Sequence, residues 1–445
     1  MAEMISEEDA LYALEIVRKI CETVGPGLAG SQEERQRAEI IRQELEAHLG
    51  GENVSVEEFC FAPGGFHGVL RSSALFTLLA VLLNLSLGLL PGIPPLLTMA
   101  ASLVCASLAA LPALFDSILY MEFVDRFLKQ KRSQNVTGKL RKPGTEQVRR
   151  VLILSGHHDS ALEFTWLRCL NAIQRWANPP GEQDSARTDA RYRFLAIIFV
   201  TLTVTMFLGF FSIFIISLVQ MAFILAGSDL VLLRGTPGWI LLSYPLLPSI
   251  IVGLFYIRGT KNGGNVPGAA DNLAASALVV AMCRFLVRNP EYLPEDTELR
   301  LISFGSEESG LRGSRRYVAR HLEELQRLDA RVLNFEVVAH PEISILTTDV
   351  SGVKNDPDLV GSVKAAAERA SVPHAVVTNP TGGGGSDAGS FTQAGFKAVT
   401  LQPMKMPHQM IAFYHQKWDT PEVLSIEPLF NALKLVFEWV RQGGK

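Results

Sequence analysis

Two long runs without charge constrain this chain more than any other feature of its sequence. No charged residue stands between Ser72 and Phe115, and between Phe194 and Ile257 only Asp229 and Arg234 carry a charge. A transmembrane helix needs about 20 apolar residues, so each run is long enough for two such helices. Buried core is the other explanation, but a water-soluble domain of this size could hardly cover so much uninterrupted apolar surface. We therefore expect two transmembrane hairpins, about four spans in all, with a lipid bilayer as partner.

The composition excludes some classes of protein. Of the 445 residues, 19% are charged, and 41 basic against 45 acidic residues give a net charge of −4. This balance attracts no polyanion, so we expect no nucleic-acid partner. The five cysteines show no Cys-x-x-Cys spacing, which argues against a disulfide framework.

Outside the apolar runs, helix and strand patterns alternate. Strand-like stretches lie at 54–56, 135–139, 151–155, 298–303, 332–338 and 398–401. Helical spacing occurs at 7–21, 31–48, 272–288, 314–326, 357–370 and beyond Pro421. Ser31 and Glu34 form a capping box at the start of the second of these helices. Alternation of this kind predicts an α/β sheet covered by helices on both faces.

Acidic residues and histidines gather in five short motifs, mostly where an apolar strand ends. The motifs are Ser155–Ser160, Gly268–Asn272, Phe304–Gly310, Leu333–Val338 and Phe413–Thr420. Taken singly, most have an ordinary structural explanation, such as a polar turn at His157–Asp159 or a helix cap at Asp271. Glu336 is different, because it interrupts an apolar strand, where a charge is rare unless it is paired or binds a metal.

Taken together, the motifs supply one kind of site. They contain a histidine, an aspartate, two glutamates and a second histidine, which are ligand types that zinc accepts. Five ligands, one of them shared, suit two metal ions about 3.5–4 Å apart. Of the adjacent Glu307 and Glu308, one can bind metal while the other stays free as a base.

The order and spacing of these motifs resemble those of the dizinc aminopeptidases and carboxypeptidases of metallopeptidase clan MH, family twenty-eight. The matching patterns are His-x-Asp, Gly-Ala-x-Asp-Asn, Glu-Glu-x-Gly-Leu-x-Gly-Ser and Tyr-His-x-x-x-Asp-Thr, and the segment Gly25–Ser31 also looks like the family's N-terminal segment. The resemblance covers about 30–60, 133–160 and 262–440. It implies a zinc-exopeptidase-like fold, a three-layer αβα sandwich with a central mixed β-sheet, to which transmembrane helical hairpins are added.

The apolar runs divide this fold into five segments. We predict the N-terminal part of the peptidase domain at residues 1–70 and a first transmembrane hairpin at 71–120. The peptidase domain returns at 121–192 with the first metal ligand. A second hairpin occupies 193–258, and residues 259–445 carry the remaining ligands and the catalytic glutamate.

The resemblance implies a role for each metal ligand. His157 and Glu336 match the ligands of a first zinc, Asp271 matches the bridging carboxylate, and Glu308 and His415 match the ligands of a second zinc. Glu336 stands where many relatives have aspartate, which affects the coordination geometry more than metal binding. We therefore expect two Zn²⁺ per chain.

Three further residues match catalytic positions of the family. Glu307 corresponds to the glutamate that acts as general base, and Asp159 to the carboxylate behind the first histidine. Tyr414 corresponds to a tyrosine that stabilises the tetrahedral oxyanion in some members. The implied function is a membrane-anchored zinc aminopeptidase that hydrolyses peptide substrates.

Two other functions are compatible with the same fold. A glutaminyl cyclase-like acyltransferase would hold one zinc, which the complete His157 position disfavours. A non-catalytic membrane scaffold would lack ligands, and no ligand position is missing from the sequence. Side-chain preference, exopeptidase against endopeptidase action and oligomeric state are not encoded in these motifs.

The orientation in the membrane follows from parity and charge. His157 and Asp271 lie before and after the second apolar run but belong to one site, so they must be on the same side of the membrane. The first run likewise separates the N-terminal helices from His157. Each run therefore crosses the membrane an even number of times. The flanks on that side carry many basic residues, whereas the far turns carry only Arg234. The basic residues are Arg71, Arg126, Lys129, Lys131, Arg132, Arg187, Arg191, Arg193, Arg258 and Lys261. With an N-terminus that lacks the features of a signal peptide, this asymmetry predicts a multi-pass protein with a cytoplasmic catalytic domain.

Overall fold

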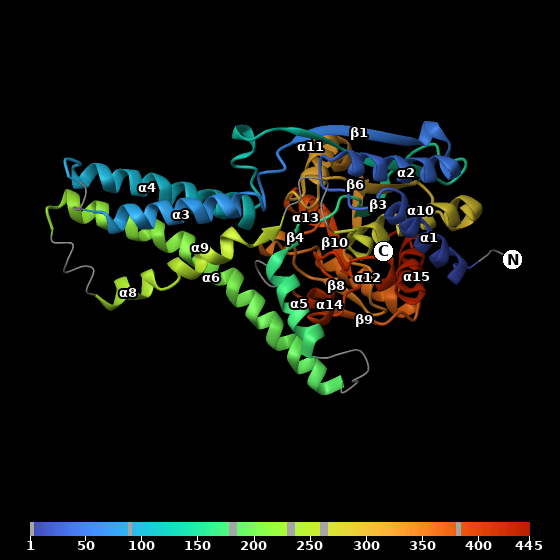
Figure 1. The fold of residues 1–445 in the computed structure, drawn as a ribbon. Helices are drawn as coiled ribbons and strands as arrows, with labels where there is room; N and C mark the ends of the chain where they lie inside the picture. The colour runs from blue at the N-terminus through green and yellow to red at the C-terminus, as the bar shows by residue number, and fades with distance from the viewer. Residues whose placement is uncertain (1–3, 88–90, 178–184, 229–235, 259–265, 380–383) are drawn as a thin grey trace. The chain divides into compact units, whose positions relative to one another are not determined.

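The computed structural model describes residues 4–87, 91–177, 185–228, 236–258, 266–379 and 384–445 (Figure 1). The chain forms two compact units. The first contains residues 1–63, 130–163 and 259–445, and the second contains residues 64–129 and 164–258. Residues 64–70, 121–129 and 164–192, which the sequence prediction groups with the peptidase domain, belong to the second unit.

A mixed sheet forms the centre of the first unit. Among the described residues it has eight strands in the order β1-β2-β6-β3-β7-β10-β8-β9. These strands are β1 (Val54–Phe61), β2 (Lys131–Arg141), β3 (Arg150–His157), β6 (Thr297–Phe304), β7 (Asp329–Phe335), β8 (Ile343–Leu346), β9 (His374–Val377) and β10 (Lys397–Gln402). The neighbours β6, β3, β7 and β10 run parallel, so their carboxyl ends meet at one edge. The two-residue strands β4 (Glu163–Phe164) and β5 (Ile257–Arg258) lie outside this sheet.

Helices cover both faces of the sheet. Along β3, Leu152 and Leu154 belong to one hydrophobic cluster and Val151 and Ile153 to another, as the two-residue period of a strand requires. The first face is covered by α1 (Glu7–Thr23), α2 (Gln32–Leu49), α10 (Ala274–Arg288), α12 (Pro357–Arg369) and α15 (Ile426–Arg441). The second face is covered by α11 (Arg312–Gln326) and α13 (Asp387–Gln393). The predicted three-layer αβα sandwich with a central mixed sheet is confirmed.

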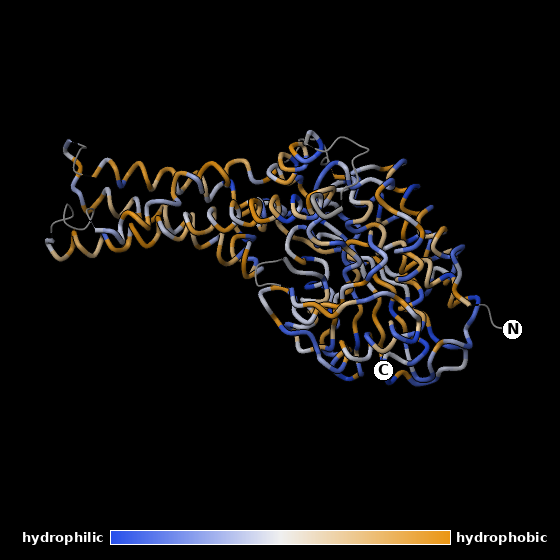
Figure 2. The backbone as a smooth tube through the Cα atoms, turned by 90° about the horizontal axis from the view of Figure 1, so that it is seen from below, coloured by the Kyte–Doolittle hydropathy of each residue, from blue (hydrophilic) through white to orange (hydrophobic). Residues whose placement is uncertain are grey.

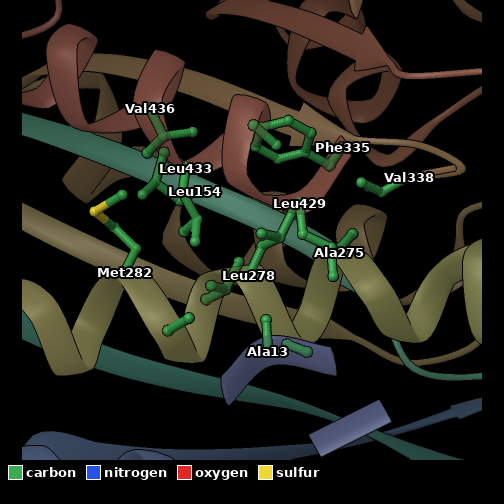
Figure 3. Close-up of a cluster of buried hydrophobic side chains, with 14 of the residues drawn as sticks. Ala13, Leu154, Ala275, Leu278, Met282, Phe335, Val338, Leu429, Leu433 and Val436 are labelled. Carbon is green, nitrogen blue, oxygen red and sulfur yellow. The ribbon is translucent and has the colours of Figure 1, made fainter. Parts of the chain in front are cut away.

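The helix α10 lies at the centre of the larger cluster. Figure 3 shows Leu278 and Met282 of α10 beside Leu154 of β3 and Leu433 of α15. All four side chains are almost completely buried. Burying a side chain of this size stabilises a fold by about 1.5–3 kcal/mol, so this layer contributes much of the stability of the first unit.

Three local details differ from the sequence prediction. The strand β7 ends at Phe335, so Glu336 follows the strand and does not interrupt it. Asp271 lies in a separate turn, Ala269–Leu273, and α10 begins only at Ala274. The hydroxyl of Ser31 accepts the N–H of Glu34 at 3.0 Å, but the Glu34 carboxylate accepts the N–H of Gly30, so only half of the capping box forms.

The second unit consists mainly of apolar helices. They are α3 (Val69–Leu85), α4 (Pro95–Pro112), α5 (Thr165–Ala177), α6 (Ser185–Leu225), α8 (Pro237–Ser243) and α9 (Leu246–Leu254). Figure 2 shows the predominance of hydrophobic residues along the long helices of this unit.

Four helices of the described residues have the length and composition needed to cross a membrane. They are Pro95–Ile118, Thr188–Leu225, Pro237–Leu254 and Ala269–Arg288. The first three overlap the predicted hairpins at 71–120 and 193–258, as does the shorter apolar helix Val69–Leu85, although Thr188–Leu225 begins five residues before the second hairpin and Val69–Leu85 two residues before the first. The fourth is 89% buried in the structure because it contains α10, the core helix of the first unit.

Large apolar residues of the second unit point outward. Leu82 of α3, Leu97 of α4 and Leu247 of α9 are 52%, 62% and 67% exposed. The interior holds small residues, such as the fully buried Ala80 of α3 and Ala106 of α4, together with larger ones such as Phe210 and Ile213 of α6. A water-soluble bundle rarely leaves so many large apolar residues exposed on its outer surface.

Polar side chains connect these helices to one another. The amide of Asn84 on α3 donates to the hydroxyl of Ser102 on α4 at 2.6 Å and to that of Ser217 on α6 at 3.2 Å. The two serine hydroxyls lie 3.0 Å apart. Small residues at helix contacts and hydrogen bonds between helices are typical of bundles packed in lipid.

Candidate metal centre

The carboxyl ends of three neighbouring strands bring the candidate residues together. His157 is the last residue of β3, and Glu336 follows β7 directly. Glu307 and Glu308 lie on the loop after β6, which pairs with β3 on its other side. These strands run parallel, so their final residues face the same edge of the sheet. His415 comes from the loop that follows α14 (His408–Ala412).

The carboxylate of Asp271 lies between two histidines. Its Oδ1 is 3.4 Å from Nε2 of His157, and its Oδ2 is 3.2 Å from Nε2 of His415. Each carboxylate oxygen thus faces a different imidazole. This is the arrangement that a carboxylate shared by two metal ions requires.

Three glutamates complete the cluster. On the His157 side, Nε2 is 3.6 Å from Oε2 of Glu307 and 3.8 Å from Oε2 of Glu336. On the His415 side, Nε2 is 3.4 Å from Oε1 of Glu308. All five residues expected to bind metal from the sequence therefore meet in one place, with Glu307 beside them.

Two sets of these residues have the spacing of a metal site. The ligand atoms of His157, Asp271 and Glu308 lie within 4.8 Å of one another, as do those of His157, Glu307 and Glu336. The second set includes Glu307, so distance alone does not separate the base from the ligands.

The cluster carries more negative charge than its surroundings balance. Burial and the charges of neighbouring acids raise the pKa of Glu307, Glu308 and Glu336 well above the ordinary value. Burial acts against the charged form of His157, but Glu307, Asp159 and Asp271 raise its pKa well above normal overall. Oδ2 of Asp271 and Oε1 of Glu308 are buried and accept no well-aligned hydrogen bond, although Nε2 of His415 lies 3.2 and 3.4 Å from them. Divalent cations would supply the missing positive charge and the missing partners, so the residues fit a metal centre.

Asp159 positions several of these groups at once. One carboxylate oxygen accepts the N–H of Glu307 and the other accepts the N–H of Glu308, both at 3.0 Å. The first of these oxygens also lies 3.4 Å from Nδ1 of His157. A single aspartate therefore holds a histidine on one strand end and the two glutamates on the next.

Tyr414 lies against the second histidine. The ring centroids of Tyr414 and His415 are 4.0 Å apart. Burial, reinforced by the charges of Asp271 and Glu308, raises the pKa of the Tyr414 hydroxyl well above its ordinary value. The hydroxyl therefore keeps its proton and can donate a hydrogen bond.

The backbone turns sharply at three points around the site. Ser306, Val337 and His415 have φ angles of +56°, +52° and +50°, which residues other than glycine rarely adopt. Each stands at or next to a candidate ligand or base. Such conformations cost about 1–3 kcal/mol each and tend to occur where a site requires them.

Two residues that support the site were not identified from the sequence. The side-chain amide of Asn272 donates to Oε2 of Glu336 at 2.5 Å and to the carbonyl of Phe335 at 2.7 Å. Asn272 is the last residue of the Gly-Ala-x-Asp-Asn motif, and this position in the motif is the sequence feature that could have pointed to its role. Asp387 is buried near the site, and its charge raises the pKa of Glu307.

Glu34 also has a different role from the one its motif suggests. Its Oε1 accepts the hydroxyl of Ser133 at 2.6 Å and the N–H of Ser306 at 3.0 Å. Burial, with the nearby charge of Asp159, raises its pKa to about 8. The residue read as half of a capping box therefore holds the loop that leads into Glu307.

Part of the chain is similar to known peptidases. Residues 257–440 match the family model of Peptidase family M28. Aminopeptidase YwaD of Bacillus subtilis (strain 168) is 31% identical over 182 residues, which are 40% of this chain and 38% of that protein. The match thus spans less than half the length of this curated relative.

Solved structures share the fold at low sequence identity. A zinc aminopeptidase from Bacillus subtilis, BSAP, aligns with a TM-score of 0.52 and 14% identity, covering 99% of this chain and 96% of its own. A glutaminyl cyclase from an Acidobacteriales bacterium aligns with a TM-score of 0.51 and 12% identity, covering 99% and 97%. Both likenesses concern the fold, and the fold is common to the two activities.

Proposed function

We propose, from the premise that this chain belongs to peptidase family M28, that it is a membrane-anchored aminopeptidase that uses two zinc ions. His157 and Glu336 would hold one ion, and Glu308 and His415 the other. Asp271 would contribute one carboxylate oxygen to each. When bound, zinc ions supply a Lewis acid that polarises the peptide carbonyl and lowers the pKa of a water molecule.

Glu307 is assigned as the general base. Its carboxylate faces the same position as His157 and Asp271, and its raised pKa suits a group that takes up and returns a proton. It would take the proton of the attacking water and pass it to the nitrogen of the leaving amine. Asp159 holds the backbone N–H groups of both Glu307 and Glu308. The Glu307 carboxylate lies 3.6 Å from Nε2 of His157, and that of Glu308 lies 3.4 Å from Nε2 of His415.

We assign to Tyr414 the role of donating a hydrogen bond to the oxyanion that forms when water attacks the peptide carbonyl. Its hydroxyl keeps its proton because burial and the surrounding carboxylates oppose ionisation. A donor of this kind, placed where negative charge develops, typically contributes about 2.7–4 kcal/mol to transition-state stabilisation.

One observation carries the proposal more than any other. Asp271 presents a different carboxylate oxygen to each of two histidines, and both histidines lie beside a glutamate. A carboxylate that offers each of its oxygens to a different histidine suits two ions that share it. The arrangement therefore supports two ions, and with them peptidase over cyclase chemistry.

A substrate panel tests the activity. The full chain, purified in detergent and supplied with zinc, is assayed on aminoacyl chromogenic amides, on their N-acetylated forms and on a peptide with N-terminal glutamine. We expect release of the chromophore from the free-amine substrates and little from the acetylated ones. Cyclisation of the glutaminyl peptide without amide hydrolysis would overturn the assignment in favour of the acyltransferase. The Glu307→Gln variant controls for contaminating peptidases.

Membrane anchoring is supported by the packing of the second unit. Large apolar residues such as Leu97 and Leu247 are exposed, while alanine and hydrogen-bonded serine and asparagine lie inside. We propose that α3, α4, α6 and the pair α8–α9 cross the bilayer.

The charge asymmetry of the flanks supports a cytoplasmic catalytic domain. Single cysteines placed at Ile93, in the turn before α4, and at exposed Glu146, in the first unit, test this orientation in a cysteine-free background. In intact cells an impermeant thiol reagent should label Ile93→Cys and spare Glu146→Cys. The reverse pattern would place the active site outside the cytoplasm.

A further inference from the structure

The helix α5 exposes apolar side chains along one face. Ile173 and Trp176 are 54% and 86% exposed, and Cys169 and Ala172 are exposed as well. Their positions follow the i, i+3, i+4, i+7 spacing that places residues on a single side of a helix. We call this set, Cys169, Ala172, Ile173 and Trp176, the α5 stripe.

The opposite face of α5 is already covered. Leu167 and Leu170 are buried, as are Asn171 and Gln174. The helix contacts α6, and Phe164, just before α5, stacks on Phe199 of α6 with ring centroids 6.1 Å apart. Figure 1 shows α5 running beside the part of α6 that begins at residue 185. Core packing therefore accounts for one face of α5 and leaves the stripe unexplained.

The neighbouring part of α6 presents the same kind of surface. Phe194 and Ile197 are each 63% exposed, and Val200 is 54% exposed. The uncharged part of α6 runs from Phe194 to Leu225, which at 1.5 Å per residue is about 48 Å, against about 30 Å for the hydrocarbon core of a bilayer. A part of α6 near Phe194 therefore reaches the edge of the hydrocarbon, and α5 lies beside that part.

We propose that α5 lies in the interfacial region of the bilayer with the α5 stripe directed toward the acyl chains. At 13 residues α5 is too short to cross a membrane. Tryptophan, the residue type of Trp176, concentrates at the level of lipid headgroups. The α5 stripe is apolar and exposed, like the neighbouring face of α6. This inference rests on the proposed membrane anchoring, and it adds a surface-bound helix to the four spans.

The test uses a fluorophore at Cys169 in the full chain. Cys21, Cys60, Cys105 and Cys283 are replaced by serine, and the remaining thiol carries an environment-sensitive dye. The protein is reconstituted into phosphatidylcholine vesicles that contain a nitroxide either near the headgroup or deep in the acyl chains. Two reference chains, in which Cys169 is replaced by serine, carry the dye on a single thiol elsewhere. One has Leu82→Cys, on the exposed side of α3, and the other keeps native Cys60, which is exposed on β1.

We expect the shallow nitroxide to quench the Cys169 dye more strongly than the deep one. The deep nitroxide should quench the Leu82→Cys dye more strongly, and neither should quench the Cys60 dye. A Cys169 dye that behaves like the Cys60 dye would overturn the inference, and so would one quenched best by the deep nitroxide. A blue-shifted but unquenched dye would mean that a protein surface covers the stripe, which also overturns it.

The Leu82→Cys reference separates this inference from the anchoring on which it rests. If the Leu82→Cys dye is quenched and the Cys169 dye is not, the bundle is embedded and only the placement of α5 is wrong. If neither is quenched, the membrane anchoring itself fails. A second probe at Ile173→Cys, on the same face of α5, guards against a local effect of the dye at Cys169.

Discussion

The carboxylate of Asp419 accepts the backbone N–H of Asp271 at 3.0 Å and so fixes the residue whose side chain lies between the two histidines. The same carboxylate accepts the N–H of Ala270 at 2.7 Å. Asp419 is separated from Asp271 by most of the C-terminal half of the chain. The last acidic residue of the Tyr-His-x-x-x-Asp-Thr motif thus acts on the metal centre through the backbone.

Replacing Asp419 with asparagine should weaken metal binding without unfolding the protein. The amide keeps one acceptor oxygen but turns an NH₂ group toward the second backbone N–H, which tilts Asp271. We expect zinc affinity to fall by about 10–100-fold, as is usual when the partner of a ligand is removed. Competition with a fluorescent chelator measures this. Asp356→Asn is the control, because Asp356 also accepts a backbone N–H, at the start of α12; an equal loss of affinity there would contradict a specific role for Asp419.

The adjacent glutamates should respond differently to the same substitution. Glu307→Gln removes the proposed base and should lower kcat by at least about 100-fold while two zinc ions remain bound. Glu308→Gln removes a ligand and should lower the occupancy of one metal position. Metal content and kcat measured on both variants check this. Near wild-type turnover in Glu307→Gln would show that the base lies elsewhere.

His158 should make the first unit sensitive to acid. Burial lowers its pKa to about 3 from an ordinary value of 6.5, and its Nδ1 lies 2.8 Å from the hydroxyl of Ser303. The unfolded chain binds a proton at His158 as the pH falls through 6.5, whereas the folded chain does so only near 3. The stability that the neutral ring contributes is therefore present above pH 6.5 and is lost below it, by about 1.4 kcal/mol per pH unit.

The thermal midpoint of the metal-free protein in detergent, followed from about pH 7 to about pH 5, measures this loss. His158→Gln should flatten the decline, because glutamine does not titrate. His374→Gln, at a partly exposed histidine on β9, should leave it unchanged. Identical pH dependence in wild type and His158→Gln would exclude His158 as its source.

Two glycines in the second unit should differ in their tolerance of alanine. A Cβ at Gly209 of α6 would lie 2.1 Å from Oγ of Ser249 on α9 and 2.8 Å from the carbonyl of Pro245. A Cβ at Gly238 of α8 would meet nothing within 4 Å. We expect Gly209→Ala to destabilise the bundle by about 1–3 kcal/mol and Gly238→Ala to have little effect. Unfolding in mixed micelles distinguishes them, and equal stability of the two variants would argue against close packing of α6 on α9.

Much of the fold follows from local patterns in the sequence. The apolar strands that became β3, β6 and β10 and the helices α1, α2, α11 and α12 have clear periodicity, because each buries one defined face. The strands β8 and β9 were not predicted, since each has only four residues and little alternation. The helix α5 was also missed. Its 13 residues lie between the first metal-ligand motif and the second apolar run, and the apolar spacing of its exposed side was not read as a helix.

The site was predictable as far as its motifs reach. His157, Glu308 and Glu336 come together because the parallel strands β3, β6 and β7 end at one edge of the sheet. Asp271 lies in the turn before α10 and His415 in the loop after α14, so their place beside the other three was implied only by the family motifs. The supporting contacts of Glu34 were not predictable, because Ser133 and Ser306 are far from it in the chain and only the tertiary fold brings them near. The capping-box pattern already explained a glutamate at position 34, so nothing in the sequence indicated that it also binds the loop before Glu307.

The number of zinc ions per folded chain tests the central claim most directly. Protein stripped of metal in detergent is titrated with zinc, and bound metal is counted by elemental analysis after removal of free ions. Two histidines that share one carboxylate predict two ions per chain, with peptidase activity rising to its maximum only as the second position fills. A single tightly bound ion, with no second at saturating zinc, would contradict the account and favour the one-zinc cyclase chemistry.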